Sequence, residues 1–320
     1  MPPRLLAMCT RVFWNTNSIA KVAVRSCDWA VSDEPRVWFV PRGTRRTGHG
    51  DGTSHEWTSK HSSVATSIWD LGTDDGINER GLAAHVLYLN PEPGMYEPAD
   101  DRPSVMNALW AQYVLDNFAS VAEVVEHVGD VRITSPDIRG AQMGTHLAVE
   151  DSSGDAAVIE PIGGRLVVHH GPEYNVMANS PVLSEQLENL KRYAPFGGEL
   201  PPPGDITSLD RFVRSSYFLH YLPEPQSLQE AVAGVLSIGR NTAVPFGAPY
   251  NDGGVFPTWW HAVSDVTNLT YYFSATRSPS VFWLDLAALA DGTESLALDP
   301  HDITLVGDVT SRLEPTALPY

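Results

Sequence analysis

Cys9 is the residue of this sequence best suited to nucleophilic chemistry. A cysteine thiolate is a strong nucleophile, but it needs a neighbouring base or a lowered pKa. If the residues before Cys9 were removed, its own α-amine would be that base, with an ordinary pKa of about 7.7–8.0. Taken alone, Cys9 is more simply interpreted as a buried free thiol at the start of the first strand.

Other motifs add the charged and amide side chains that such a nucleophile would use. Arg25 and Asp28 lie in 24–29 (VRSCDW), Asn179 lies in 176–181 (VMANSP), and Arg211 lies in 210–214 (DRFVR). Residues 75–82 (DGINERGL) predict a turn that leads into a strand. Each motif also has a plain structural interpretation, namely an ion pair for Arg25 and Asp28 and a turn residue for Asn179.

The elements that must position these residues are mostly short strands. Residues 145–150 and 155–160 flank a DSSG turn and predict a hairpin, which 165–169 extends into a meander. A further strand pair is predicted late in the chain. The expected strands are 22–25, 36–40, 81–89, 145–150, 155–160, 165–169, 270–274 and 281–285.

Helices are predicted between sets of strands and not in strict alternation with them. Residues 104–117 show apolar side chains at helical spacing. Ser120 with Glu123 forms a capping box for a helix over 120–127, Ser208 or Thr207 caps a helix over 208–219, and another covers 227–236. Residues 42–56 predict a loop. This order favours an α+β fold in layers over a doubly wound parallel sheet.

Composition excludes several classes of function. The 320 residues carry a net charge of −18, which disfavours nucleic acid and anionic membranes as partners. Cys9 and Cys27 are the two cysteines, too few for a disulfide framework or a thiolate zinc site. No metal site is expected. No apolar run reaches the ~18 residues of a membrane span. As written, the chain is expected to be cytoplasmic, and a truncated start would allow a periplasmic or secreted protein.

The motifs taken together, in this order and spacing, resemble the choloylglycine hydrolase family, which includes penicillin V acylases and bile salt hydrolases. The resemblance covers nearly the whole chain and implies a four-layer αββα sandwich of the N-terminal nucleophile hydrolase type. The matching segments are CTR at 9–11, RSCDW at 25–29, DGINERGL at 75–82, WAQYVLD at 110–116, NSP at 179–181, RFVR at 211–214 and VFW at 281–283.

The resemblance implies a role for each candidate residue. Cys9 corresponds to the nucleophile, while Arg25 would lower the pKa of its thiol and Asp28 would hold its α-amine. Asn179 corresponds to the side-chain donor of the oxyanion hole. The backbone N–H of Tyr88 would be the second donor, at a position where bile salt hydrolases usually have Asn and penicillin acylases often have Tyr.

Some positions stay open. Arg211 corresponds to the family's arginine near the nucleophile, but Arg214 lies on the same helical face and could be confused with it. Trp29, Trp38 and Trp69 are candidates to line an apolar acyl pocket. Cys27 stands where the family often has Met, so a second thiol is expected near the site.

The implied function is hydrolysis of linear amide C–N bonds, without a cofactor, by a single domain over 9–320. Residues 1–8 are expected to be a leader that is removed, unless Met8 is the true start. Penicillin V, fatty acyl amides or N-acyl homoserine lactones are the expected substrates, with conjugated bile salts as the alternative. A non-catalytic binding protein on the same fold is the rival from another class. The resemblance also suggests a homotetramer.

Overall fold

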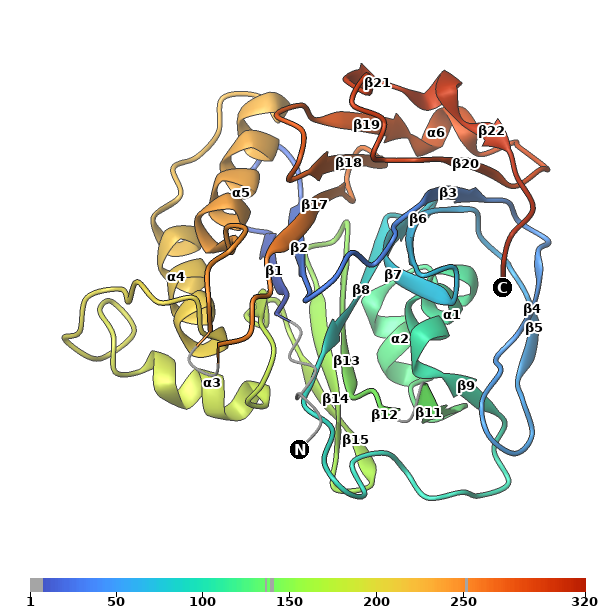
Figure 1. The fold of residues 1–320 in the computed structure, drawn as a ribbon, viewed down its shortest axis with the longest axis horizontal. Helices are drawn as coiled ribbons and strands as arrows, with labels where there is room; N and C mark the ends of the chain where they lie inside the picture. Colours follow the sequence, from blue (N-terminus) through green and yellow to red (C-terminus); the bar gives the residue numbers. More distant parts are fainter. Residues whose placement is uncertain (1–7, 136, 139–140, 251–252) are drawn as a thin grey trace.

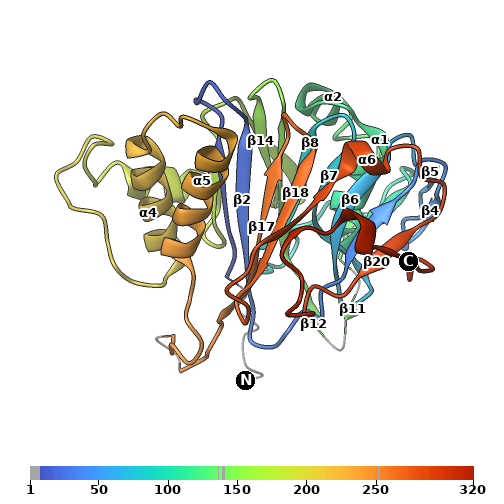
Figure 2. The same ribbon diagram turned by 90° about the horizontal axis from the view of Figure 1, so that it is seen from above.

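Two β-sheets packed face to face form the centre of the molecule, and helices cover their outer faces (Figure 1). The computed structural model describes residues 8–135, 137–138, 141–250 and 253–320. Among these residues, no helix is both long enough and apolar enough to cross a membrane. The layers follow in the order helix, sheet, sheet, helix (Figure 2), which is the α+β sandwich expected from the sequence.

The first sheet contains the strand that directly follows Cys9. Thr10 of this strand lies opposite Ser26, and Arg11 lies opposite Arg25, in an antiparallel pair. Strands from the second half of the chain flank the pair on both sides. The order in this sheet is β16 (Val176–Met177), β1 (Thr10–Trp14), β2 (Val22–Asp28), β17 (Thr258–Asp265), β18 (Thr270–Ala275), β19 (Phe282–Asp285) and β21 (Gly307–Asp308).

The second sheet contains the strand that ends at Tyr88. It also contains the predicted meander, and both this meander and the β18–β19 pair of the first sheet are confirmed. The order is β15 (Arg165–His170), β14 (Ala156–Ile162), β13 (Thr145–Asp151), β8 (Leu82–Tyr88), β7 (Gly72–Asn78), β6 (Ser63–Ile68), β3 (Val37–Val40), β20 (Leu296–Leu298) and β22 (Glu314–Pro315).

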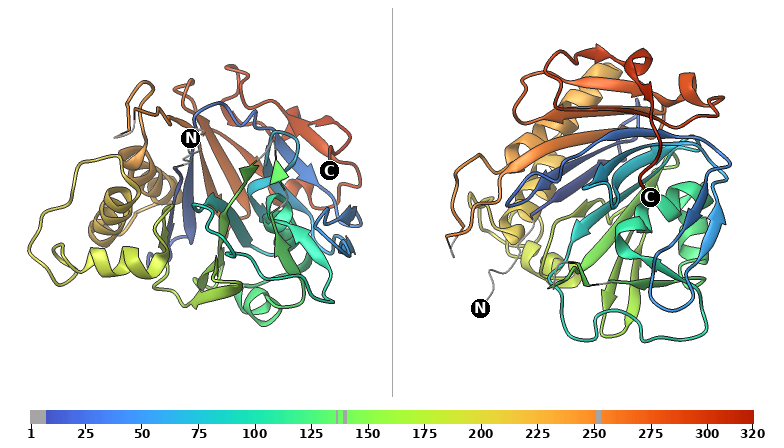
Figure 3. Two further views of the ribbon diagram at one scale, coloured as in Figure 1. Left: turned by 60° about the horizontal axis from the view of Figure 1, so that its bottom comes forward. Right: turned by 45° about the vertical axis from the view of Figure 1, so that its right-hand side comes forward.

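Helices from two parts of the chain cover the two sheets. α4 (Ser208–Tyr221) and α5 (Leu228–Thr242) pack on β1 and β2, and α3 (Leu183–Leu190) packs beside α4 (Figure 3). α1 (Trp110–Asn117) packs on β7 and β8, and α2 (Val121–Glu126) covers β13 and β14. The short α6 (Leu286–Leu289) lies against β18. Apolar clusters fill the space between the sheets and beneath each helical layer.

The structure corrects several predicted elements. The helix expected over 104–117 begins at Trp110, because β9 (Ser104–Met106) pairs with β10 (Arg132–Thr134) and a 3₁₀ turn over Asn107–Leu109 follows. The start of the 75–82 motif belongs to β7. The loop expected over 42–56 contains β4 (Arg45–Thr47), which pairs with β5 (Glu56–Thr58). α3 was not predicted. The remaining short elements are β11 (Asp137–Ile138), β12 (Ala141–Gln142) and a 3₁₀ turn over Thr310–Arg312.

A buried polar network joins the two sheets beside the candidate residues. His85 of β8 contacts the carboxylate of Asp75 through Nδ1 and that of Glu150 through Nε2, the latter at 2.6 Å. Arg11 of the first sheet donates to Glu150, with Nε at 3.0 Å, and Tyr271 donates to Asp75 at 2.8 Å. Burial opposes a charge on His85, but Glu150 and Asp75 outweigh it and raise the pKa of His85 to about 9. The network therefore fixes the position of β1 against β8.

Candidate active site

Cys9 is buried at the entry to β1, where residues of β2 surround it. It is only 3% exposed. Nη2 of Arg25 lies 3.7 Å from its Sγ. The register explains this contact: because Arg11 lies opposite Arg25, Cys9 is the diagonal neighbour of Arg25, within reach of a long side chain. The pairing of β1 with β2 thus brings together a thiol and a cation that are sixteen residues apart.

The surroundings of Cys9 favour its thiolate. A hydrogen bond from the Cys27 thiol and the positive charge of Arg25 lower the pKa of Cys9, although burial and the charges of Asp28 and Asp74 act in the opposite direction. The pKa of Cys27 shifts in the opposite direction, because burial and its hydrogen bond to Cys9 raise it well above the usual value. Cys9 is therefore the thiol of the pair that ionises first, as a nucleophile must.

Arg25 is held in place by groups from both sheets. Its Nη2 pairs with the carboxylate of Asp74 on β7 and donates to the carbonyl of Val86 at 3.2 Å. Its guanidinium also lies over the ring of Trp260, 4.4 Å from the centroid. Asp74 is absent from the predicted site. It directly precedes the motif at 75–82, and that adjacency is the signal that could have found it.

Arg211 of α4 reaches the backbone of Cys9, whereas Arg214 does not. Nη1 of Arg211 donates to the carbonyl oxygen of Cys9 at 2.6 Å and also contacts the hydroxyl of Thr10. Its Nη2 donates to Oδ1 of Asn179 at 2.9 Å. Arg214 instead donates to the carbonyl of Asp205. The ambiguity between the two arginines is thereby resolved in favour of Arg211 as the one beside Cys9.

Asn179 links Cys9 to the end of β8. Its Oδ1 accepts a hydrogen bond from the backbone N–H of Cys9, and its Nδ2 donates to the carbonyl of Tyr88 at 2.8 Å. Gln186 of α3 donates to the carbonyls of Asn179 and of Pro181, the latter at 2.6 Å. The unpredicted helix α3 therefore fixes the backbone that carries Asn179.

The backbone N–H of Tyr88 lies on the edge of β8 that faces the site. The N–H of Leu89 donates to the carbonyl of Gly144, so these two residues form a hydrogen-bonded pair. Tyr88, opposite Thr145, belongs to the next, non-hydrogen-bonded pair, and its backbone N–H and C=O therefore point away from β13. Two backbone carbonyls on that edge face the site. The carbonyl of Val86 accepts a hydrogen bond from Arg25, and the carbonyl of Tyr88 accepts one from Asn179. The geometry is compatible with the predicted role of the Tyr88 N–H.

Asp28 contacts Met8, the residue that directly precedes Cys9. The N–H of Met8 donates to the Asp28 carbonyl at 2.9 Å, and the Met8 side chain is buried against Val244 and Phe256. Oδ1 of Asp28 accepts from Thr258 at 2.6 Å, while Oδ2 has no hydrogen-bond partner among the described residues. Burial, opposed by the charge of Arg211, raises the pKa of Asp28 to about 6.

An aromatic wall stands next to Tyr88. Trp29 packs edge-on against Trp69 and against Tyr88, with ring centroids 5.8 and 5.7 Å apart, and Trp259 and Met143 complete the cluster. Trp38 is not brought there, because it packs in a separate buried cluster with Val40 and Ala297. Of the three tryptophans predicted to line an acyl pocket, the structure therefore places two beside the site.

One group of side chains could in principle share a cation. Among the described residues, only the ligand atoms of Cys27, Asp33 and Asp74 lie within 4.8 Å of one another. Asp74 already pairs with the guanidinium of Arg25, and Sγ of Cys27 lies 3.7 Å from Oδ2 of Asp33 and 3.8 Å from Oδ2 of Asp74, either of which can accept its proton. These contacts account for the group without a metal ion.

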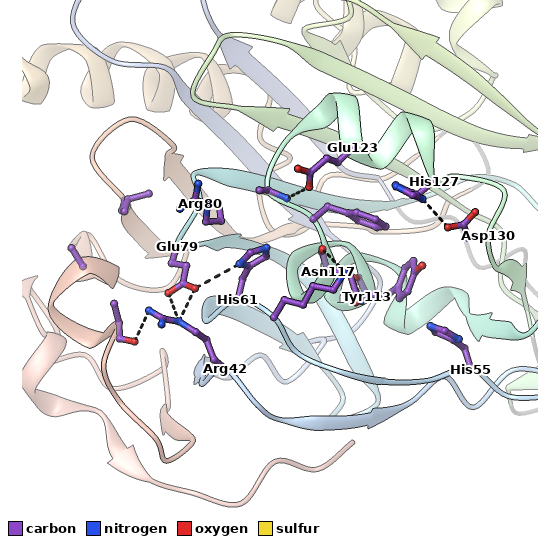
Figure 4. A pocket seen from close by; sticks show the side chains of 16 residues that line it. Arg42, His55, His61, Glu79, Arg80, Tyr113, Asn117, Glu123, His127 and Asp130 are labelled. Atoms are coloured by element: carbon purple, nitrogen blue, oxygen red, sulfur yellow. Dashed lines mark hydrogen bonds and ion pairs between the residues drawn. The ribbon is translucent and has the colours of Figure 1, made fainter.

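A hollow of the described surface lies over α1 and α2. It measures about 1080 Å³. Figure 4 shows Arg42 and His61 directed toward Glu79, and His127 directed toward Asp130. Its charged groups thus largely pair with one another. None of the predicted site residues lines it, so it is not the place of the proposed chemistry.

Comparisons with known proteins agree with this geometry. Residues 9–297 match the family described as linear amide C–N hydrolases, choloylglycine hydrolase family. The chain is 35% identical to a penicillin V acylase of Pectobacterium atrosepticum, over 96% of this chain and 90% of that protein. It is 24% identical to a bile salt hydrolase/transferase of Bifidobacterium longum, over 86% and 94%.

Solved structures give the same result for the fold. A penicillin V acylase from Agrobacterium tumefaciens superposes with a TM-score of 0.86 at 36% identity, covering 97% of this chain and 98% of that one. A conjugated bile acid hydrolase from Clostridium perfringens superposes with a TM-score of 0.80 at 21% identity, over 94% and 98%. The N-terminal nucleophile hydrolase fold is thereby confirmed. The chain belongs to the choloylglycine hydrolase family of linear amide C–N hydrolases.

Proposed function

We propose that this protein hydrolyses linear amides with Cys9 as an N-terminal nucleophile. The observation that carries the proposal is the convergence of Arg25, Asn179 and Arg211 on Cys9. Arg25 contacts the sulfur, Asn179 the backbone nitrogen and Arg211 the carbonyl oxygen. Any buried residue needs partners for its backbone N–H and carbonyl. A guanidinium beside the sulfur, by contrast, favours the thiolate, which an inert structural thiol does not need.

Removal of residues 1–8 is part of the proposal. Two observations support it: the family match begins at Cys9, and the buried Oδ2 of Asp28 has no hydrogen-bond donor among the described residues, Nη1 of Arg211 being 3.8 Å away. A freed α-ammonium at Cys9 would supply that donor. If Met8 is the true start, loss of this methionine suffices. Otherwise the Cys9 thiolate attacks the Met8 carbonyl, the acyl group passes from nitrogen to sulfur, and water cleaves the resulting thioester.

The reaction then follows from the positions of the groups. The α-amine of Cys9 accepts the thiol proton, and the thiolate attacks the amide carbon. As the tetrahedral intermediate collapses, the same amine delivers the proton to the leaving nitrogen. Water next hydrolyses the thioester on Cys9. Arg25 stabilises the thiolate before it attacks and when it is released again, and Arg211 fixes the backbone of the nucleophile.

The oxyanion hole is assigned to Asn179 and to the N–H of Tyr88. An amide NH₂ carries two hydrogens, and one of those of Asn179 is bonded to the Tyr88 carbonyl. The second remains to donate to the oxygen on which charge develops. Removing one such donor costs about 2.7–4 kcal/mol in other hydrolases.

The acyl group of the substrate is proposed to be aromatic or otherwise apolar. The wall formed by Trp29, Trp69 and Tyr88 would pack against such a group. The relative that is 35% identical is named a penicillin V acylase. We therefore propose penicillin V-like or fatty acyl amides, with N-acyl homoserine lactones as a further candidate. Conjugated bile salts are the alternative, suggested by the name of the 24% identical relative.

Initial rates on penicillin V, glycocholate and an acyl homoserine lactone test this assignment. We expect turnover of penicillin V or the lactone above that of glycocholate, and no turnover of any of them by Cys9→Ala. Faster turnover of glycocholate would move the substrate to the alternative. Inactivity of the wild type on all three, with ligand binding retained, would favour a binding protein. The homotetramer and the cytoplasmic location stay predictions, the first of them tested by light scattering.

A further inference from the structure

The register of the β1–β2 pair, extended by one residue beyond Thr10 and Ser26, places Cys27 opposite Cys9. Met8 donates its N–H to the carbonyl of Asp28, which continues the register that pairs Thr10 with Ser26. Hydrogen-bonded and non-hydrogen-bonded pairs alternate along an antiparallel ladder, so Cys9 and Cys27 form a non-hydrogen-bonded pair. In such pairs the Cα atoms are about 4.5 Å apart, inside the range of about 4.4–6.8 Å found in disulfides.

Both thiols are 3% exposed, and the hydrolysis proposed above uses only Cys9 as a nucleophile. Hydrogen bonding between the two side chains is the main effect that lowers the pKa of Cys9. Sγ of Cys27 also lies 3.7 Å from Oδ2 of Asp33 and 3.8 Å from Oδ2 of Asp74. A thiol has one proton, so these carboxylates are alternative acceptors for it. Cys27 thus has bases beside its thiol, and in the amide reaction it acts only through its hydrogen bond to Cys9, not as a nucleophile.

We propose that Cys27 is a resolving cysteine that converts peroxide-oxidised Cys9 into a reversible Cys9–Cys27 disulfide. The Cys9 thiolate attacks one oxygen of a hydroperoxide, the O–O bond breaks, and Cys9 sulfenic acid and an alcohol or water form. The sulfur of Cys27 then attacks the Cys9 sulfur and gives its proton to a carboxylate. The S–O bond breaks, and the hydroxyl leaves as water after taking up that proton.

Charged side chains near the two thiols can assist both the oxidation of Cys9 and the attack by Cys27. Arg25, 3.7 Å from the Cys9 sulfur, favours the thiolate that reacts with peroxide. Burial, reinforced by the charge of Asp74, raises the pKa of Asp33 to about 7, which suits it to accept a proton from Cys27 near neutral pH. As long as the disulfide is present, the Cys9 sulfur could not attack a substrate. The disulfide would also protect Cys9 from further oxidation to the sulfinic acid, which thiols do not reverse.

The inference depends on the proposed function only for the thiolate character of Cys9, and its main readout does not require turnover. The purified protein is treated with about one equivalent of hydrogen peroxide and digested with trypsin without reduction. We expect a peptide that links the fragment ending at Arg11 to the fragment 26–36, together with a loss of about 2 Da and of both free thiols. Dithiothreitol should restore both thiols and, where turnover was present, activity.

Cys27→Val is the matched control because it keeps an apolar side chain of similar size at the buried position. We expect this variant to gain about 16 or 32 Da at Cys9, with inactivation that dithiothreitol does not reverse after the second oxygen. The result that overturns the inference is wild-type Cys9 carrying the same oxygen adducts with Cys27 still free. If amide turnover is absent but the linked peptide forms, the hydrolase proposal fails and the disulfide stands.

Discussion

Arg211 of α4 holds the carbonyl oxygen of Cys9 with a 2.6 Å hydrogen bond from Nη1, while its Nη2 donates to Asn179 at 2.9 Å. One guanidinium therefore orients both Cys9 and Asn179. A planar fork with fixed donors can do this, whereas a lysine ammonium cannot satisfy the two sites in the same geometry. Arg214, three residues along the helix, has neither contact.

Replacing Arg211 should therefore cost activity even when the positive charge is retained. We expect Arg211→Lys to lower kcat/KM about 10- to 100-fold, the equivalent of losing one charge-assisted hydrogen bond of ~1.5–3 kcal/mol. Arg214→Lys is the matched control and should stay within about threefold of the wild type. Equal losses in the two variants, measured as kcat/KM on the same substrate, would show that Arg211 has no special position.

Asn179 should act mainly on the transition state. Asn179→Asp keeps an oxygen that can accept from Cys9 and Arg211 but removes the amide donor. We expect kcat to fall about 100- to 1000-fold with a much smaller change in KM, because the oxyanion forms only during the reaction. Steady-state kinetics separate these constants. An effect confined to KM would assign Asn179 to substrate binding and would leave the oxyanion without its side-chain donor.

Arg25 should control the ionisation of Cys9. Its charge favours the thiolate, so Arg25→Gln should raise the pKa of Cys9 and shift the rise in alkylation rate to higher pH. The rate of Cys9 alkylation by iodoacetamide as a function of pH measures this directly. Arg25→Lys should restore part of the shift, and Arg240→Gln, at an exposed position of α5, should leave the profile unchanged. An unchanged profile in Arg25→Gln would remove Arg25 from the activation of the thiol.

The His85 network should make stability fall as pH rises. The pKa of His85 is about 9 in the folded chain and about 6.5 in an unfolded one. A group whose pKa rises on folding stabilises the fold fully when the pH is below its unfolded pKa. This contribution is lost as the pH rises from about 6.5 through 9. The free energy of unfolding should fall by on the order of 3 kcal/mol across that pH window. Urea unfolding at pH 6 and pH 9.5 measures the loss, which His85→Gln should lack. Parallel pH profiles for the two proteins would contradict it.

Much of the site could be predicted because its residues fall in short, ordered motifs. Arg25 and Asp28 follow Cys9 at a fixed spacing, and a single antiparallel pair places them beside it. Asp74 could not be placed by the same reasoning, because it reaches Arg25 only through the packing of one sheet on the other. Cys27 was expected near the site, but its position relative to Cys9 requires the register to be known.

The β7 strand shows why a local pattern failed. The motif at 75–82 predicts a turn that leads into a strand. The turn forms only at 79–81, ahead of β8, while Asp75 and Gly76 lie in a buried strand. Asp75 is tolerated because His85 and Tyr271 bond its carboxylate. Gly76 fits because a Cβ there would lie 2.7 Å from the Val64 carbonyl oxygen and 2.8 Å from Leu115. Tertiary packing thus overrode the turn propensity of both residues.

Trp38 illustrates the same limit for the acyl pocket. Three tryptophans were equal candidates in the sequence, since nothing local distinguishes a pocket residue from a core residue. Trp38 is 2% exposed, and its Nε1 donates to Ser67 at 3.1 Å within the second sheet. Trp29 and Trp69 lie at the ends of strands or in loops, where side chains from both sheets meet next to Tyr88.

The first residue of the active protein tests the central claim most directly. Intact mass and N-terminal sequencing should show that protein which turns over amides begins at Cys9, and that Cys9→Ala is inactive. Protein that keeps Met8 attached to Cys9 and still hydrolyses amides at the wild-type rate would contradict the account, because its nucleophile would then have no free α-amine.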